Sequence, residues 1–175
     1  MIPARLNSSR IKQKNLRFLG DKPLVSHVID TVVNSGHFSD VYLNSESDIF
    51  KEIAKEHKIN FFERDKALAM GDVTNDLFMH DFLKRIDCDY VVQVNTTSPF
   101  ITKDDISSVI NLLINQGYDT VQSIKIEQIE GLFEGKPINF IDKHKMPQSQ
   151  DLKPIQLYSS GIMGFRREKY LKNMK

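Results

Sequence analysis

The chain has 175 residues, of which 40% are hydrophobic and 27% charged, so it is long enough to bury a core of its own. The 24 lysines and arginines nearly balance the 23 aspartates and glutamates, so the overall charge favours neither a nucleic-acid nor a membrane partner. A lone cysteine, Cys88, excludes an internal disulfide and favours a cytoplasmic location, and no apolar run reaches the roughly 20 residues of a membrane span.

Strands and helices are predicted to alternate along the chain. The expected elements are a short strand at 1–4, a helix at 22–36, a strand at 40–45, a helix at 47–57 and a strand at 59–62. A helix at 75–85, a continuously apolar strand at 90–94, a helix at 102–117 and a strand at 120–126 follow. The first helix is predicted to end at Gly36 and to bury one face, made of Leu24, Val25, Val28, Ile29, Val32 and Val33.

This alternation implies an α/β fold of the Rossmann-like type, a mainly parallel sheet with helices on both faces. Ligands bind such sheets beyond the carboxyl ends of the strands, so residues 5–15 and 95–99 are the first candidates for a site. Residues 1–175 are expected to form one domain, cut short at one or both ends. Residues 127–158 lose periodicity and are rich in Gly and Pro, which predicts an irregular excursion with a functional or interface role.

Positive charge is concentrated near the start of the chain. Residues 5–17 contain five cations and no acid, and the first acid is Asp21. Such a run is often only a solvated surface. Here it follows a predicted strand and shares a loop with Asn7, Ser8 and Ser9, small polar residues that allow backbone N–H groups to converge on an anion. The loop therefore predicts a phosphate site, although it has neither a Walker P-loop nor a G-x-G-x-x-G turn.

Four segments carry a more specific signal: IPARLNSSRIKQKNLRFLGDKPL, RDKALAMGDVTND, VQVNTTSPF and SQDLKPIQLYSSGIMGF. In this order they resemble the signatures of the acylneuraminate cytidylyltransferases, the CMP-sialic acid synthetases. Those signatures read IPAR with a Ser-containing basic loop and KN, then Arg-Pro-x-x-Leu-Ala with a Thr/Ser-rich turn. Leu-Leu-Gln-Pro-Thr-Ser-Pro-Leu follows, and then Gln-Asp-Leu-Pro with Asn-Gly-Ala-Ile-Tyr. The resemblance covers nearly the whole chain.

The resemblance implies a nucleotidyltransferase that transfers CMP from CTP to a sialic-acid-like nine-carbon keto sugar acid and releases pyrophosphate. Catalysis would be mostly positioning and neutralisation of charge. The resemblance assigns phosphate-holding, catalytic roles to Arg5, Arg10 and Lys14, nucleotide binding to Asn7, Ser8, Asn15, Arg64, Thr74 and Asn95, and sugar binding to Gln150, Asp151 and Ser160. It also implies Mg²⁺ and a homodimer joined through the excursion.

Some residues depart from the family's pattern and leave alternatives open. Asn95 stands where the family has Gln, Ser160 where it has Asn, and no metal-binding Asp-x-Asp follows Phe165. The sequence therefore names no metal ligand, and a non-catalytic nucleotide-binding protein is a second hypothesis. Kdo, legionaminate and pseudaminate are alternative substrates. NTTSPF also suits a plain turn, and Gln150 and Asp151 suit a surface loop. Nucleic-acid binding is disfavoured, because apart from Phe18 the basic loop has no interleaved aromatic residue.

Overall fold

The computed structural model describes residues 1–141 and 148–174, so His144 and Pro147 of the expected excursion lie outside the described residues. The chain forms two compact units, Met1–Gln122 with Gly161–Lys175, and Ser123–Ser160. Within the described part, none of the helices is long and apolar enough to cross a bilayer.

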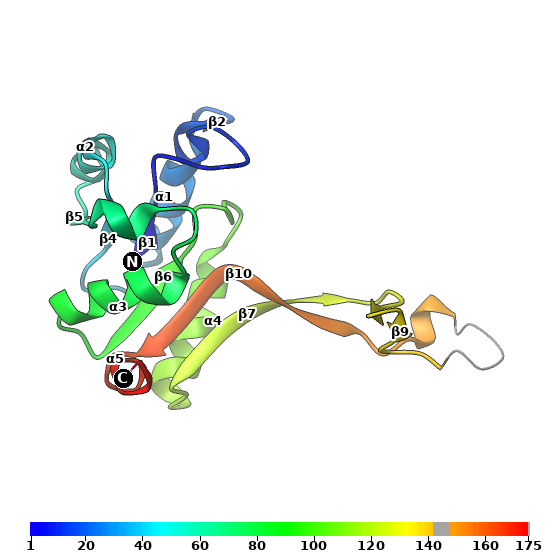
Figure 1. Ribbon diagram of the computed structural model, residues 1–175. Helices are drawn as coiled ribbons and strands as arrows, with labels where there is room; N and C mark the ends of the chain where they lie inside the picture. Colours follow the sequence, from blue (N-terminus) through cyan, green and yellow to red (C-terminus); the bar gives the residue numbers. More distant parts are fainter. Residues whose placement is uncertain (142–147, 175) are drawn as a thin grey trace. The chain divides into compact units, whose positions relative to one another are not determined.

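The first unit contains a parallel sheet (Figure 1). Strands β1 (Ile2–Pro3), β4 (Tyr42–Ser45) and β5 (Asn60–Glu63) lie in the order β1-β4-β5, and both pairs are parallel. β1 also meets β6 (Tyr90–Val94): the Met1 amino group donates to the Val92 carbonyl at 2.8 Å, and the Val94 N–H donates to the Met1 carbonyl at 3.1 Å. The predicted alternation of strands and helices thus produces the expected mainly parallel sheet.

β6 belongs to a second three-stranded sheet, with the order β6-β10-β7. β7 spans Thr120–Glu127 and β10 spans Ile155–Arg166. β10 runs antiparallel to β6, with Met163 opposite Gln93. β6 is buried along almost its whole length, as its continuous apolar run predicts.

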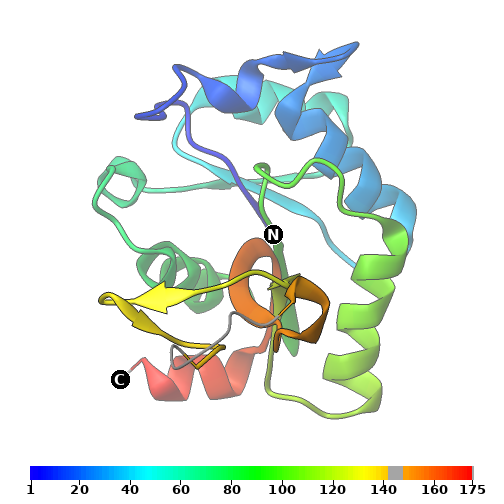
Figure 2. The same cartoon turned by 90° about the vertical axis from the view of Figure 1, so that its right-hand side faces the viewer.

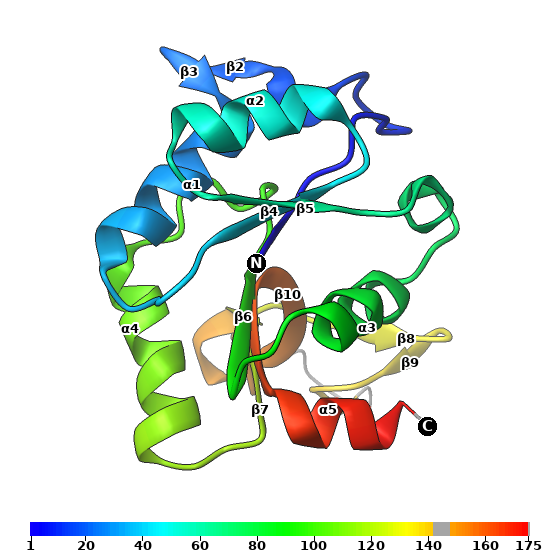
Figure 3. The same ribbon diagram turned by 90° about the vertical axis from the view of Figure 1, so that its left-hand side faces the viewer.

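Helices cover both faces of the sheet in the first unit (Figure 3). α1 (Leu24–Ser35), α2 (Asp48–Glu56) and α4 (Lys103–Ile110) share one apolar cluster, which includes Ile2, Leu43 and Val92. α3 (Asn75–Arg85) and α5 (Arg167–Asn173) share the other, which includes Phe62 and Val91. Because Val91 and Val92 are neighbours in one strand, they point to opposite faces and serve different clusters.

The ends of the helices follow the predicted signals. Gly36 ends α1 in the left-handed conformation at φ 70°. Thr102 and Asp105 form the expected capping box at the start of α4, which continues into a short π-helix, η3 (Asn111–Asn115). One prediction for α1 is wrong: Val33 is 43% exposed, because the face that packs on the sheet is narrower than the apolar stripe.

Short elements connect these layers. The loop after β1 contains the 3-10 helix η1 (Lys14–Leu16) and the small hairpin of β2 (Phe18–Leu19) and β3 (Lys22–Pro23). A second 3-10 helix, η2 (Lys66–Ala69), follows β5.

The second unit is more regular than the sequence predicts. It contains a hairpin of β8 (Leu132–Phe133) and β9 (Lys136–Pro137), visible in Figure 2, and the 3-10 helix η4 (Ser149–Asp151). Side-chain amides hold its irregular backbone: Asn139 Nδ2 donates to the carbonyls of Ile129 and Lys153, both at 2.8 Å. Such hydrogen bonds from side-chain amides satisfy backbone groups that have no partner in a neighbouring strand, and the Gly/Pro content of the segment does not predict them.

Candidate functional site

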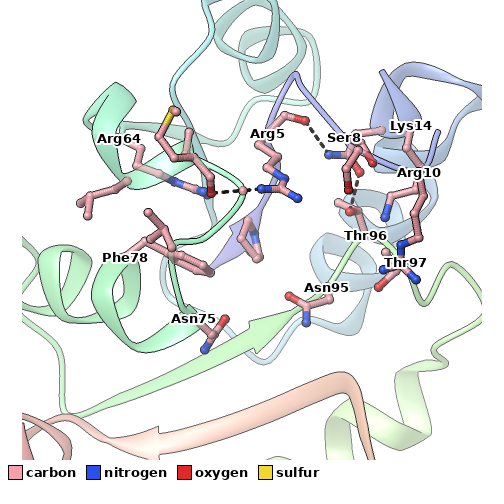
Figure 4. A pocket seen from close by; sticks show the side chains of 18 residues that line it. Arg5, Ser8, Arg10, Lys14, Arg64, Asn75, Phe78, Asn95, Thr96 and Thr97 are labelled. Atoms are coloured by element: carbon pink, nitrogen blue, oxygen red, sulfur yellow. Dashed lines mark hydrogen bonds between the residues drawn. The ribbon is translucent and has the colours of Figure 1, made fainter. Parts of the chain in front are cut away.

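A cavity of about 280 Å³ lies beyond the carboxyl ends of three parallel strands. Arg5 follows β1, Arg64 follows β5 and Asn95 follows β6, and all three side chains line the cavity (Figure 4). Segments that are far apart in the sequence meet here because neighbouring parallel strands end at the same edge of the sheet. The described lining residues are Pro3, Arg5, Ser8, Ser9, Arg10, Lys14, Asn15, Arg64, Leu68, Ala69, Met70, Gly71, Val73, Asn75, Phe78, Asn95, Thr96 and Thr97.

Four cations line this cavity, and its described lining contains no aspartate or glutamate. Arg10 and Lys14 lie on one side with Ser8, whereas Arg64 lies on the other and Arg5 lies between (Figure 4). The pKa of Lys14 is lowered, first by burial and then by the neighbouring Arg10 and Arg5. Crowded like charges disfavour their own charged forms, so an anion in the cavity would relieve this repulsion.

Arg64 is buried at the wall of the cavity, with only 4% of its surface exposed. Its Nε donates to Asn44 Oδ1 at 2.6 Å and its terminal nitrogen donates to the Asn44 carbonyl at 2.7 Å. The guanidinium also lies 4.5 Å from the centre of the Phe78 ring. Burial is the main cause that lowers its pKa to about 10, so the side chain is still charged at neutral pH and presents a fixed cation to the cavity.

The basic loop is fastened to the strand ends by Asn15. Asn15 Nδ2 donates to the Arg5 carbonyl at 2.9 Å, and the Thr96 hydroxyl donates to Asn15 Oδ1 at 2.7 Å. Arg5 reaches across to the Met70 carbonyl at 3.2 Å. Because Asn15 is 4% exposed and both ends of its amide are used, it orders the loop as well as lining the cavity.

The other sequence candidates lie elsewhere in the structure. Asn7 is exposed and lines an adjacent hollow that also borders Ala69 and Met70. Thr74 is exposed at the start of α3 and does not line the cavity, whereas its neighbour Asn75 does. The three sugar-binding candidates, Gln150, Asp151 and Ser160, are exposed residues of the second unit.

Two cavity residues from the first turn of α3, Asn75 and Phe78, were not among the sequence candidates. Thr97 also lines the cavity and lies within the candidate segment 95–99. A helix that follows a strand and a loop starts near the carboxyl edge of the sheet, so the position of α3 was the available signal. Nothing in the sequence indicates that Phe78 packs on Arg64.

The sheet order and the cationic cavity define a Rossmann-like nucleotidyltransferase fold, and solved structures of the same fold agree. The structure of a CMP:2-keto-3-deoxy-manno-octonic acid synthetase complexed with CTP aligns with a TM-score of 0.76 at 14% identity, over 99% of this chain and 75% of that one. A 4-diphosphocytidyl-2C-methyl-D-erythritol synthase from Anaerococcus prevotii aligns with a TM-score of 0.66 at 16% identity, over 99% and 75%.

The chain belongs to the cytidylyltransferase family, because the family described as Cytidylyltransferase matches residues 1–130. An N-acylneuraminate cytidylyltransferase of Streptococcus agalactiae is 29% identical over 98% of this chain and 44% of the relative. A pseudaminic acid cytidylyltransferase of Campylobacter jejuni is 31% identical over 87% of this chain and 71% of the relative. The chain thus spans less than half the length of the acylneuraminate relative that it matches.

Proposed function

We propose that this protein is a CTP-dependent cytidylyltransferase, which transfers CMP to a sialic-acid-like nine-carbon keto sugar acid and releases pyrophosphate. The observation that carries the proposal is the cavity lined by four cations and, in the described residues, by no carboxylate. Cations and backbone amides together offset the hydration that a triphosphate loses on binding. Support also comes from family membership and from the relatives, which are named as cytidylyltransferases of sugar acids.

In the proposed reaction, the anomeric hydroxyl oxygen of the sugar acid attacks the α-phosphorus of CTP. A new O–P bond forms while the bond to the bridging oxygen breaks, and pyrophosphate leaves with that electron pair. Arg5, Arg10 and Lys14 stabilise the charge that grows on the leaving group. The described lining contains no histidine or carboxylate, so none of these residues is assigned as the base that takes the hydroxyl proton.

The nucleotide is proposed to lie between the two sides of the cavity. Ser8 lies on the side of Lys14, and Asn95 lies at the floor, at the end of β6. Asn15 also lines the cavity. Asn7 and Thr74 are proposed to contribute from the margins of the site. Gln150, Asp151 and Ser160 remain candidates for binding the sugar acid.

Mg²⁺ is proposed to enter with CTP, bound to phosphate oxygens. The described residues of the chain contain no group of three or more His, Cys, Asp or Glu side chains able to hold a metal, and the described cavity lining has no carboxylate. The residues present therefore do not fit a resident Mg²⁺ site.

A homodimer and a cytoplasmic location complete the proposal. The second unit exposes many large apolar side chains, namely Ile124, Ile126, Ile129, Leu132, Phe133, Ile138, Ile141, Leu157 and Tyr158. So many exposed apolar side chains in one unit are typical of a surface that another protein covers, and a second copy of this chain is the proposed partner. The location rests on Cys88, which has no second cysteine to pair with.

The test is a calorimetric titration of the chain with CTP, UTP, GTP and ATP in the presence of Mg²⁺. We expect CTP to bind in preference to the others. Binding should weaken by about tenfold or more in Arg10→Ala and in Lys14→Ala, since each removes a charge-assisted contact. The matched control is Lys51→Ala, an exposed lysine of α2 outside the cavity. If none of the four nucleotides binds, the proposal is overturned.

The acceptor is tested by pyrophosphate release with CTP and a panel of sugar acids. Release with a sialic acid supports the proposed substrate, whereas release only with Kdo, legionaminate or pseudaminate would replace it by that acid. The second candidate function is nucleotide binding without turnover, and the absence of a carboxylate from the described cavity lining favours it. Tight CTP binding without release with any acid would select this second function.

A further inference from the structure

A glutamine is buried beneath the cavity in a strand that is otherwise apolar at its centre. Gln93 lies on β6 between Val92 and Val94 and has no exposed surface. Its side chain points to the same face of the sheet as Asn95, two residues further along. A fully buried glutamine is costly unless its amide is used, so its contacts indicate why it is there.

Gln93 binds two amides of the cavity at once. Its Nε2 donates to Asn75 Oδ1 at 2.6 Å and to Asn95 Oδ1 at 2.8 Å. Both asparagines line the cavity, one from the start of α3 and the other from the end of β6. Figure 4 shows their side chains facing one another across the cavity floor.

The contacts lock the orientation of all three amides. Turning the Gln93 amide round would set its Oε1 against two oxygens, which repel it. Turning the Asn75 amide round would also break its contact with β10, where Nδ2 donates to Met163 Sδ at 3.7 Å. Gln93 Oε1 is buried and has no hydrogen-bond partner among the described residues, which costs folding stability. We therefore look for the role of this side chain in the two hydrogen bonds that its Nε2 donates.

An amide oxygen has two lone pairs, and a bond from Gln93 takes one of them. An oxygen that accepts from Gln93 can therefore accept a second hydrogen bond, and a ligand amino group is a suitable donor. The exocyclic 4-amino group of cytosine is such a donor, whereas uracil has a keto oxygen at the same position. We propose that Gln93 is a positioning residue for base specificity, which holds Asn75 and Asn95 as paired acceptors for the amino group of cytosine. This inference rests on the proposed nucleotide site.

The experiment measures the affinities of the chain and its variants for CTP, for UTP and for inorganic tripolyphosphate, at pH 8. The wild type is expected to prefer CTP over UTP by at least about tenfold, the effect of one hydrogen bond gained against one lone-pair repulsion. Gln93→Met keeps the side-chain length but removes the donor, so the preference for CTP should fall towards unity. Tripolyphosphate affinity should not change, because the cations are untouched.

Gln93→Glu tests whether the preference for CTP over UTP can be reversed. A carboxylate at this position accepts hydrogen bonds, so it should turn both asparagines round and present their NH₂ groups to the ligand. The preference should then shift towards UTP, a change that a merely structural role of Gln93 would not produce. Gln122→Glu, an exposed glutamine of β7, is the matched control and should keep the wild-type preference.

The outcomes separate this inference from the proposed function. If the wild type binds neither CTP nor tripolyphosphate, the proposed function fails and the inference falls with it. If the wild type prefers CTP but both Gln93 variants keep that preference, only the inference is overturned, and the same holds if the wild type binds CTP and UTP equally. Should the Gln93 variants not fold, Asn75→Ala removes one of the two acceptors and is expected to lower the CTP preference. An unchanged preference in Asn75→Ala would overturn the inference.

Discussion

At the scale of residues, Lys14 makes the cavity sensitive to pH. Its pKa is lowered by burial and by Arg10 and Arg5, so it loses its proton at lower pH than an ordinary lysine. An anion binds better to the protonated form, so we expect CTP affinity to fall as the pH rises through the pKa of Lys14, below the ordinary value of 10.5.

The check is a series of calorimetric titrations between neutral and alkaline pH. Lys14→Arg should retain its affinity over the same range, because arginine stays charged. If the wild type and this variant lose the same CTP affinity at alkaline pH, another group is responsible for the pH dependence.

Arg64 is expected to contribute to stability as well as to the site. Arg64→Met would leave Asn44 Oδ1, on a fully buried residue, without its donor. Loss of a hydrogen bond to a charged group should lower the free energy of unfolding by about 2–3 kcal/mol. Urea unfolding measures this difference. Arg10→Ala is the control and should change stability by less than about 0.5 kcal/mol, because Arg10 is exposed; an equal loss in both variants would contradict the role of Asn44.

Part of the site could be predicted because its residues follow strands directly. Arg5, Arg64 and Asn95 each lie just beyond a strand, and the carboxyl edge of a parallel sheet brings such positions together. The contacts beneath them were not predictable. The pairing of Gln93 with Asn75 and the packing of Arg64 on Phe78 depend on where α3 docks, which side-chain packing decides and local sequence does not.

At the scale of elements, the capping box of α4 gives a pH-dependent prediction. Hydrogen bonds from the backbone N–H and then the hydroxyl of Thr102 lower the pKa of Asp105 below its ordinary value of 3.8. This stabilisation is therefore complete above that value and is lost as the pH falls through the pKa of the folded state. Thr102→Ala should lower stability by about 1 kcal/mol at pH 7.

Chemical unfolding at pH 7 and again below pH 3 tests this prediction. The difference between the wild type and Thr102→Ala should shrink in acid, because protonated Asp105 no longer accepts both bonds as a carboxylate. Ser108→Ala, on the exposed side of the same helix, is the control. A difference that stays constant with pH would mean that the cap does not involve the charge of Asp105.

A polar contact joins α1 to α2. His57, just after α2, has Nε2 at 3.1 Å from the Ser26 hydroxyl and Nδ1 at 3.2 Å from Asp30 Oδ1. The order of contacts is that of a Ser-His-Asp triad, but Ser26 is only 6% exposed and does not border the cationic cavity. We therefore interpret this cluster as a structural polar contact between two helices that cover the same face of the sheet.

The elements that the sequence predicts best are those with a sustained apolar pattern and clear end signals. The structure has α3 at Asn75–Arg85 and β6 at Tyr90–Val94, with the bounds that the sequence predicts. The signal for β6 is its continuous apolar run. The second unit was predicted less well, because short hairpins such as β8 and β9 have no periodicity to detect.

At the scale of the whole molecule, the alternation of elements predicts parallel neighbours but not every partner. β10 inserts antiparallel between β6 and β7, although β7 precedes it in the chain. That order depends on pairing between residues far apart in sequence, such as Met163 and Gln93, and no local propensity encodes it. A parallel sheet with an antiparallel strand added is a common arrangement in α/β proteins.

The proposed homodimer gives a prediction about assembly. Phe133 is 67% exposed and is one of the exposed apolar side chains of the second unit. Phe133→Glu would place a charge in an apolar interface, where it has no partner, so dimer dissociation should become easier by at least about tenfold. Phe100→Glu is the matched control, because Phe100 is 82% exposed but belongs to the first unit.

Sedimentation velocity over a range of protein concentrations separates the outcomes of this experiment. The wild type and Phe100→Glu should sediment as dimers at concentrations where Phe133→Glu is already monomeric. CTP affinity should be unchanged in Phe133→Glu, because every described cavity residue belongs to the first unit. A wild type that stays monomeric throughout, or two variants that dissociate alike, would show that the exposed apolar side chains of the second unit do not join two copies of this chain.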